Sequence, residues 1–169
     1  MSRVYSFKDY DQYLSLKPGM GFWLVAVFFL RPYLLKLSSF QIGRGAKTKA
    51  VSRLYELVYP DDFGFFLAIV ATVPVVLLFF ALAKRKPDAP ELVRKIWRHG
   101  VQLLVVAAIL NIIVVFIPIL IGRMHGIHLL DIAQLVIAVL ILVYIFRSVR
   151  LKDTFADFPA KDFADSTKR

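Results

Sequence analysis

The sequence predicts an all-α integral membrane protein, a four-helix bundle, from the length of its apolar runs and from their lack of a polar face. The runs predict spans over about 20–40, 63–83, 100–121 and 128–147. A helix rises ~1.5 Å per residue, so each run can cross a hydrocarbon layer of ~30 Å. None carries the polar stripe that a surface helix of a soluble protein needs. Since 59% of the residues are hydrophobic, a soluble bundle would leave too much apolar surface in water.

The chain divides into an arm, a membrane domain and a tail. Residues 1–18 form an N-terminal arm, whose aromatic residues among charges predict a short interfacial segment. Residues 19–148 form the four-span membrane domain. In its first loop, apolar side chains at helical spacing over 47–59 predict a short interfacial helix. Residues 149–169 form a cytoplasmic tail of single phenylalanines among acidic residues. That pattern predicts a disordered tail or a docking peptide, whose loss from residue 155 onward barely changes stability.

The net charge of +10 is explained by where the basic residues lie. They flank the predicted spans, where Lys and Arg contact anionic lipid head groups and set the orientation. This distribution favours membrane lipids as partners and argues against nucleic acid. The candidates for contact with head groups lie around the second loop; they are Lys84, Arg85, Lys86, Arg98 and His99.

The distribution of Lys and Arg also predicts the orientation of the chain. With both termini in the cytoplasm, 15 of these residues lie inside and 6 outside. The positive-inside rule favours that arrangement. The first loop is the discordant segment, because five basic residues would then lie outside.

Polar residues within the spans are expensive in lipid and therefore informative. Arg31, Asn111, Asp131 and Gln134 are expected to form one internal cluster, in which Asp131 is the counter-charge of Arg31. Gln134 lies three residues from Asp131 and so on the same helix face. The alternative is that Arg31 reaches the interface while the amides bond neighbouring backbones, as ordinary contacts between helices. A third interpretation gives the cluster a role in binding a ligand or an ion.

The residue types argue against an enzyme. The chain has no cysteine, which excludes disulfides and thiolate chemistry. It also lacks the nucleophile elbow, the phosphate-binding glycine loop and the zinc-protease motif, so no cofactor is expected. His125, His128 and Asp131 stand three apart and can in principle hold a divalent metal. Because this spacing drifts around a helix, the plainer interpretation is histidines at a helix entrance.

Short motifs in a fixed order resemble a known family. They cover the chain from Tyr10 to Pro159: Tyr10-Asp11, Leu16-Lys17-Pro18, Phe22-Trp23-Leu24, Leu30-Arg31-Pro32-Tyr33, Tyr59-Pro60-Asp61, Trp97-Arg98-His99-Gly100, Arg147-Ser148-Xaa-Arg150 and Asp153-Xaa-Phe155-Xaa-Asp157-Phe158-Pro159. In order and spacing these resemble the YfeZ-like family of small bacterial inner-membrane proteins of unknown function. The chain departs from that family at Gly19, where a second proline is usual, and over 43–49, which is more basic. The resemblance implies an inner-membrane location and four spans, and it implies no activity.

Three hypotheses about function follow from the sequence. The first is a non-enzymatic accessory or assembly component that acts through a protein partner or as a homo-oligomer. The second is an oligomeric transporter or lipid-handling protein in which Arg31 binds an anion. The third is a membrane metalloenzyme that uses His99 or the set of His125, His128 and Asp131.

Overall fold

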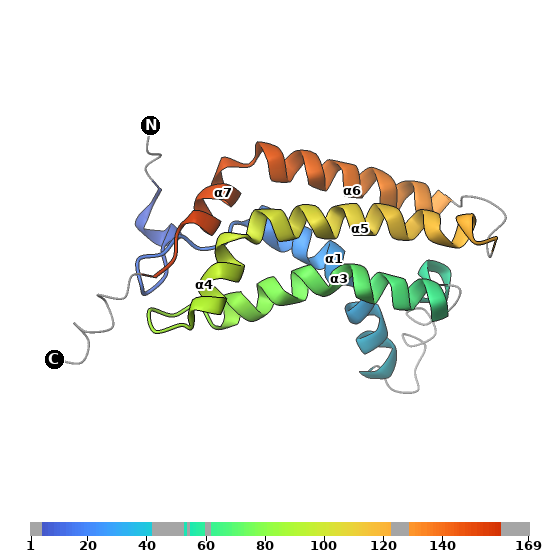
Figure 1. Ribbon diagram of the computed structural model, residues 1–169, viewed down its shortest axis with the longest axis horizontal. Helices are drawn as coiled ribbons and strands as arrows, with labels where there is room; N and C mark the ends of the chain where they lie inside the picture. The colour runs from blue at the N-terminus through green and yellow to red at the C-terminus, as the bar shows by residue number, and fades with distance from the viewer. Residues whose placement is uncertain (1–4, 42–52, 54, 60–61, 123–128, 160–169) are drawn as a thin grey trace.

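The structure, a computed structural model, describes residues 5–41, 53, 55–59, 62–122 and 129–159. In this part of the chain the regular elements are all helical, apart from one isolated bridge between Tyr10 and Leu16. Four helices are long and apolar enough to cross a membrane. They are α1 (Met20–Gln41), α3 (Asp62–Ala83), α5 (Gly100–Leu120) and α6 (Leu129–Arg147), shown in Figure 1. The predicted fold class is confirmed.

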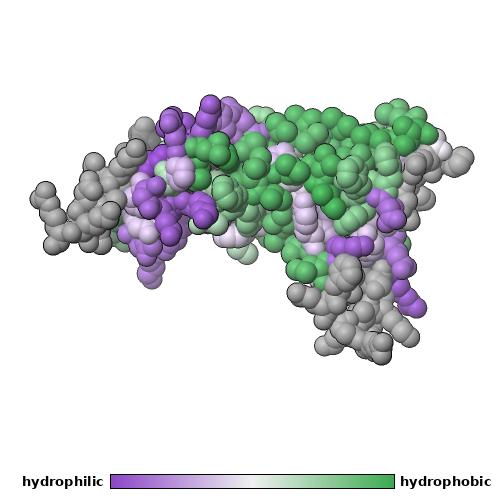
Figure 2. All heavy atoms as spheres, turned by 60° about the horizontal axis from the view of Figure 1, so that its bottom comes forward, coloured by the Kyte–Doolittle hydropathy of each residue, from purple (hydrophilic) through white to green (hydrophobic). Residues whose placement is uncertain are grey.

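The long helices pack around α5, which lies between α3 and α6, while α1 packs on α3 (Figure 1). Small residues line the contacts, including Ala71 of α3 and Ala107 and Ala108 of α5, which are almost fully buried. Small side chains let helices approach closely in lipid. The outward faces keep large apolar side chains exposed, and Figure 2 shows them as an apolar belt along the bundle. Lipid, rather than protein, is the solvent that suits this belt.

Pro32 interrupts the backbone hydrogen bonds of α1, and this interruption helps to position the Arg31 side chain. Proline has no N–H for the carbonyl four residues earlier, here that of Phe28. Nη1 of Arg31 donates to that carbonyl at 3.3 Å, and the Thr72 hydroxyl of α3 donates to the next one, that of Phe29, at 3.1 Å. Side chains thus satisfy backbone oxygens around the proline, as a helix in lipid requires.

Three short segments gather at one end of the bundle, and we call them the end cap. They are residues 5–19 with the 3₁₀ helix η1 (Phe7–Asp9), α4 (Glu91–Arg98) and α7 (Val149–Ala156). Figure 1 shows all three at the end where α1 begins and α6 ends. The N-terminus of α7 is capped by Ser148, whose hydroxyl accepts from the N–H of Leu151 at 3.2 Å. This cap explains why a new helix starts directly after the fourth span.

The prediction of a disordered tail is wrong for residues 149–159. Phe155 is only 2% exposed, and its ring lies 4.9 Å from that of Trp97 and 6.0 Å from that of Phe22. Gly100 makes room for it, because a Cβ there would lie 2.2 Å from the ring. The phenylalanine does not build a core alone; it completes one whose other members come from α1 and α4. Residues 160–169 of the predicted tail lie outside the described residues.

The predicted interfacial helix of the first loop is described only in part. Residues 55–58 are helical. Residue 53 is also helical, and residue 59 follows the helix. The other residues of 47–59 lie outside the described residues.

Candidate functional site

A cavity of about 600 Å³ lies between the helices in the half of the bundle away from the end cap. Its volume falls in the range of ordinary small-molecule pockets. Most of its lining is apolar, and the polar groups are few. The lining residues are Arg31, Glu56, Leu57, Val58, Tyr59, Gly64, Ala68, Asn111, Val114, Val115, Pro118, Leu129, Leu130, Asp131 and Gln134.

Arg31 is held by groups from three helices. Its Nη2 donates to Oδ1 of Asn111 on α5 at 2.9 Å and to Oε1 of Gln134 on α6 at 2.6 Å. Its Nη1 donates within α1 to the Phe28 carbonyl, and the guanidinium carbon lies 4.3 Å from the centre of the Phe28 ring. The structure therefore brings together Arg31, Asn111 and Gln134. In the alternative interpretation the two amides bond neighbouring backbones, whereas in the structure their oxygens accept from Arg31.

The expected ion pair between Arg31 and Asp131 is not formed. Asp131 lines the same cavity, but it stands in the first turn of α6 and has other contacts. Gln134, one turn further into the helix, takes the place beside the guanidinium. Across the residues that the structure describes, no carboxylate lies within ion-pair distance of Arg31. Within the described part of the chain, the hydrogen bonds of the Arg31 guanidinium therefore run to neutral oxygens.

Two buried donors beside the cavity lack partners. They are Nε of Arg31 and the hydroxyl of Tyr59, and neither has a hydrogen-bond partner of ordinary geometry among the described residues. The two groups lie close to each other and interact, both electrostatically and through a hydrogen bond of poor geometry. Burial raises the pKa of Tyr59, although the Arg31 guanidinium opposes the shift. The hydroxyl is therefore protonated at neutral pH and cannot supply the missing negative charge.

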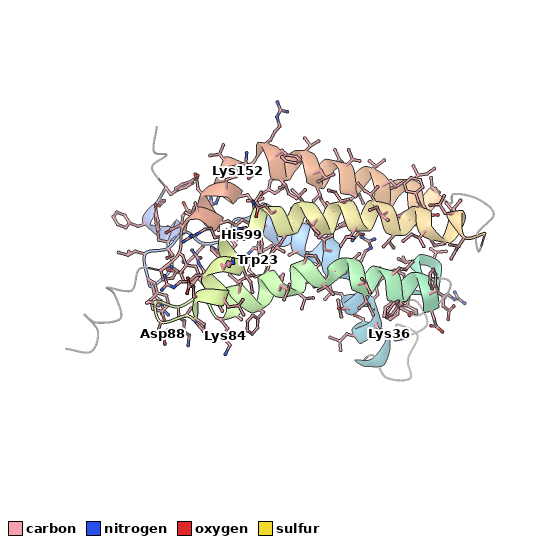
Figure 3. All side chains as sticks on the ribbon, viewed as in Figure 1. Trp23, Lys36, Lys84, Asp88, His99 and Lys152 are labelled. Carbon is pink, nitrogen blue, oxygen red and sulfur yellow. The ribbon has the colours of Figure 1, made fainter. Side chains whose placement is uncertain are left out.

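An aromatic cluster fixes Tyr59 at the edge of the cavity. The rings of Tyr55, Tyr59 and Phe65 lie 5.5 to 5.8 Å apart. Nζ of Lys36 lies 4.8 Å from the centre of the Tyr55 ring and 5.2 Å from that of Phe65. Figure 3 shows Lys36 at the end of the bundle opposite Lys84, His99 and Lys152. Sequence reasoning missed Tyr59 as a site residue, although the Tyr59-Pro60-Asp61 motif marked its position.

A second interior arginine lies in the end cap. Arg85 donates to the carbonyls of Leu16 at 3.1 Å and Asp157 at 3.0 Å, and lies 3.8 Å from a carboxylate oxygen of Asp11. Its guanidinium carbon lies 4.6 Å from the centre of the Trp97 ring. The Trp97 indole donates to the same Asp157 carbonyl at 3.1 Å. Arg85 thus joins the N-terminal arm to the segment after α7.

The prediction of a contact with lipid head groups is wrong for Arg85, because its side chain is buried. The side chain of Arg85 is only 4% exposed, so it is not available at the membrane surface. The other candidates, Lys84, Lys86, Arg98 and His99, are exposed, and contact with head groups stays a prediction for them. Nδ1 of His99 also lies 2.8 Å from the Lys95 carbonyl.

The metal hypothesis concerns His125, His128 and Asp131, of which the structure describes Asp131. His125 and His128 lie outside the described residues. Within the described ranges, no group of three His, Cys, Asp or Glu residues is placed to hold a metal ion.

Comparison with known proteins places the chain in a family. Residues 5–157 match the protein family of unknown function DUF2919. The chain belongs to this family. The match runs from Tyr5, in the arm, to Asp157, whose carbonyl accepts from Arg85 and whose carboxylate accepts from the Leu16 N–H at 2.7 Å. The matched region therefore includes both the Arg31 pocket and the end cap. No curated protein and no solved structure matches the chain.

Proposed function

We propose that this chain is a non-enzymatic, lipid-handling protein of the bacterial inner membrane that binds the anionic group of an amphiphile at Arg31. One observation carries the proposal: Arg31 lines a largely apolar cavity of about 600 Å³, and no carboxylate of the described residues lies at ion-pair distance from its guanidinium. A guanidinium stays charged in proteins, and a buried charge is costly without an opposite charge. An anion entering the cavity provides that charge.

The unpartnered donors support an oxygen-bearing anion. Arg31 and Tyr59 both line the cavity, and Nε of the first and the hydroxyl of the second are buried donors without a partner of ordinary geometry among the described residues. Hydrogen bonds to an ionised acceptor are roughly twice as strong as neutral ones. The apolar lining suits the alkyl part of the same ligand, and the four spans place the site within reach of lipid.

The compartment and orientation belong to the same proposal. The likeness to the YfeZ-like proteins favours a bacterial inner membrane, and the excess of Lys and Arg favours both termini in the cytoplasm. The end cap then lies inside and the Arg31 pocket in the outer half of the bilayer. Reporter fusions after residues 90 and 169 should report the cytoplasm, and one after residue 46 the opposite side. A cytoplasmic signal from residue 46 would refute the four-pass arrangement.

Lipid analysis of the purified protein tests the function. The wild-type protein, purified in mild detergent, should retain an anionic amphiphile that native mass spectrometry detects as an added mass. Arg31→Gln keeps a polar side chain but removes the charge, so it should lose that mass. Arg147→Gln changes an exposed arginine at the other end of the bundle and should keep it. Equal retention by the wild type and Arg31→Gln would refute the proposal.

A second candidate is an accessory component that acts through a protein partner or as a homo-oligomer. The end cap favours it, because buried contacts hold the arm, α4 and α7 as one structured surface with exposed basic residues such as Lys84, Lys86 and Arg98. Cross-linking in the native membrane from a photoreactive residue at position 86 tests this role. A defined cross-linked species supports it, and labelling of lipid alone contradicts it.

A further inference from the structure

The Arg31 cavity carries both signs of charge. Arg31 lies where α1, α5 and α6 meet, while two acidic residues line the same cavity, Glu56 from the first loop and Asp131 from the first turn of α6. Glu56 is exposed, so the cavity reaches the surface on its side. A ligand with only negative charge would meet the guanidinium favourably and these carboxylates unfavourably. A ligand with both charges satisfies the whole polar lining.

We infer that the pocket binds the zwitterionic head group of an ethanolamine phospholipid, with its phosphodiester at Arg31 and Tyr59 and its primary ammonium toward Glu56. This inference rests on the lipid-handling function proposed above and adds the class of lipid. The phosphodiester oxygens accept from the guanidinium of Arg31 and from the hydroxyl of Tyr59, since both residues line the cavity and each has a buried donor without a partner of ordinary geometry among the described residues. The ammonium donates to carboxylate oxygens at the surface side of the cavity.

The aromatic cluster argues against a quaternary ammonium. A choline group binds best over the faces of aromatic rings. Here Lys36 already lies over the faces of Tyr55 and Phe65, at 4.8 and 5.2 Å from their centres. A primary ammonium needs hydrogen-bond acceptors instead, and Glu56 provides them.

The size of the cavity fits a head group rather than a whole lipid. At about 30 Å³ for each non-hydrogen atom, the volume of a water in the liquid, a cavity of about 600 Å³ holds about 20 such atoms. That is enough for the phosphoethanolamine group, the glycerol and the first carbons of the chains. Side chains such as Val114, Val115 and Leu129 line this apolar part. The remaining acyl carbons would extend along the exposed apolar faces of the helices.

Lipid titration of the purified full-length protein tests the head group. Native mass spectrometry measures the binding of phosphatidylethanolamine, phosphatidylglycerol and phosphatidylcholine with identical acyl chains. The wild type should prefer phosphatidylethanolamine. Arg31→Gln should weaken the binding of all three lipids about 10-fold or more, since each loses a charged hydrogen-bond donor. Glu56→Gln should reduce the preference for phosphatidylethanolamine over phosphatidylglycerol by about 3-fold, because an exposed charge contributes modestly. Glu56→Lys should reverse that preference.

Matched variants distinguish a failure of the head-group inference from a failure of the proposed lipid-handling function. Glu91→Gln, an exposed acidic residue of α4, should leave the preference unchanged. If Arg31→Gln abolishes binding but neither Glu56 variant alters the preference, the head-group inference is refuted and the proposed function stands. If Arg31→Gln has no effect, both are refuted. Glycerophosphoethanolamine, which has the head group without acyl chains, should compete at least 100-fold more weakly than the lipid, since it buries no acyl CH₂ groups. Equal competition would identify a free soluble ligand and overturn the lipid assignment.

Discussion

Arg31 and Arg85 are both interior arginines, but their surroundings differ in charge and in space. Arg85 has a carboxylate of Asp11 at 3.8 Å, two carbonyl acceptors and the face of Trp97. Arg31 has two amide oxygens, one carbonyl and a cavity of about 600 Å³. Arg85 thus has a counter-charge and joins segments of the fold, whereas Arg31 lies beside a cavity with no carboxylate of the described residues at ion-pair distance. Arg85 should therefore matter for stability and Arg31 for binding.

The largest loss of stability is expected from the core of the end cap. Phe155→Ala should lower the free energy of unfolding by about 3–5 kcal/mol, because it empties space between Trp97 and Phe22. Thermal unfolding in detergent measures the loss. Phe7→Ala is the control, since the Phe7 side chain is 92% exposed and should contribute almost nothing. Similar melting temperatures for the two variants would show that α7 does not pack on the bundle.

Arg85→Gln should cost nearly as much, about 3 kcal/mol. The variant leaves Asp11 without its buried counter-charge and removes donors from the carbonyls of Leu16 and Asp157. Limited proteolysis should then cut the arm and the segment after α7 faster than in the wild type. Arg98→Gln, at an exposed arginine of α4, should leave both readouts unchanged. An Arg85→Gln protein as stable as the wild type would remove the contrast with Arg31.

Arg31→Gln should be milder for stability, at about 1 kcal/mol or less. Its amide partners lose one hydrogen bond each from the guanidinium, but the glutamine can donate in its place and the cavity lets water reach them. A double-mutant cycle sharpens this point. Arg31→Gln with Gln134→Ala should show a coupling of about 1 kcal/mol, whereas Arg31→Gln with Asp131→Asn should be additive within about 0.5 kcal/mol. Strong coupling to Asp131 would restore the ion pair predicted from the sequence.

The smallest effect is expected at Asp9, on the surface of the end cap. Nη2 of Arg150 donates to its carboxylate at 2.6 Å, and this hydrogen bond lowers the pKa of Asp9 below its ordinary value of 3.8. A lowered carboxyl pKa means that the contact stabilises the fold at pH values above 3.8. The contribution is lost as the pH falls through the lowered pKa. A carboxyl NMR titration should find the midpoint below 3.8, and Arg150→Gln should raise it. A midpoint at 3.8 in the wild type would contradict the contact.

The sequence by itself determined the four spans, and it offered the meeting of Arg31, Asn111 and Gln134 as one of the interpretations of its polar residues. Both follow from a local rule: an apolar run of sufficient length must span, and polar groups inside lipid must find one another. Only the tertiary structure decided which residue bonds to Arg31. Asp131 and Gln134 share one face of α6, and the depth of α6 relative to α1 selects Gln134.

The tertiary structure also determined which residues are buried in the end cap and what Tyr59 contacts. Arg85 reads as one more basic residue of a surface loop, and Phe155 as a lone aromatic in a polar tail. Their burial depends on partners far away in the chain, such as Leu16 for Arg85 and Phe22 for Phe155. Tyr59 likewise meets Arg31 only because the first loop returns to α3 beside α1. Such contacts arise from the packing of the whole bundle, so no local pattern of hydropathy or charge records them.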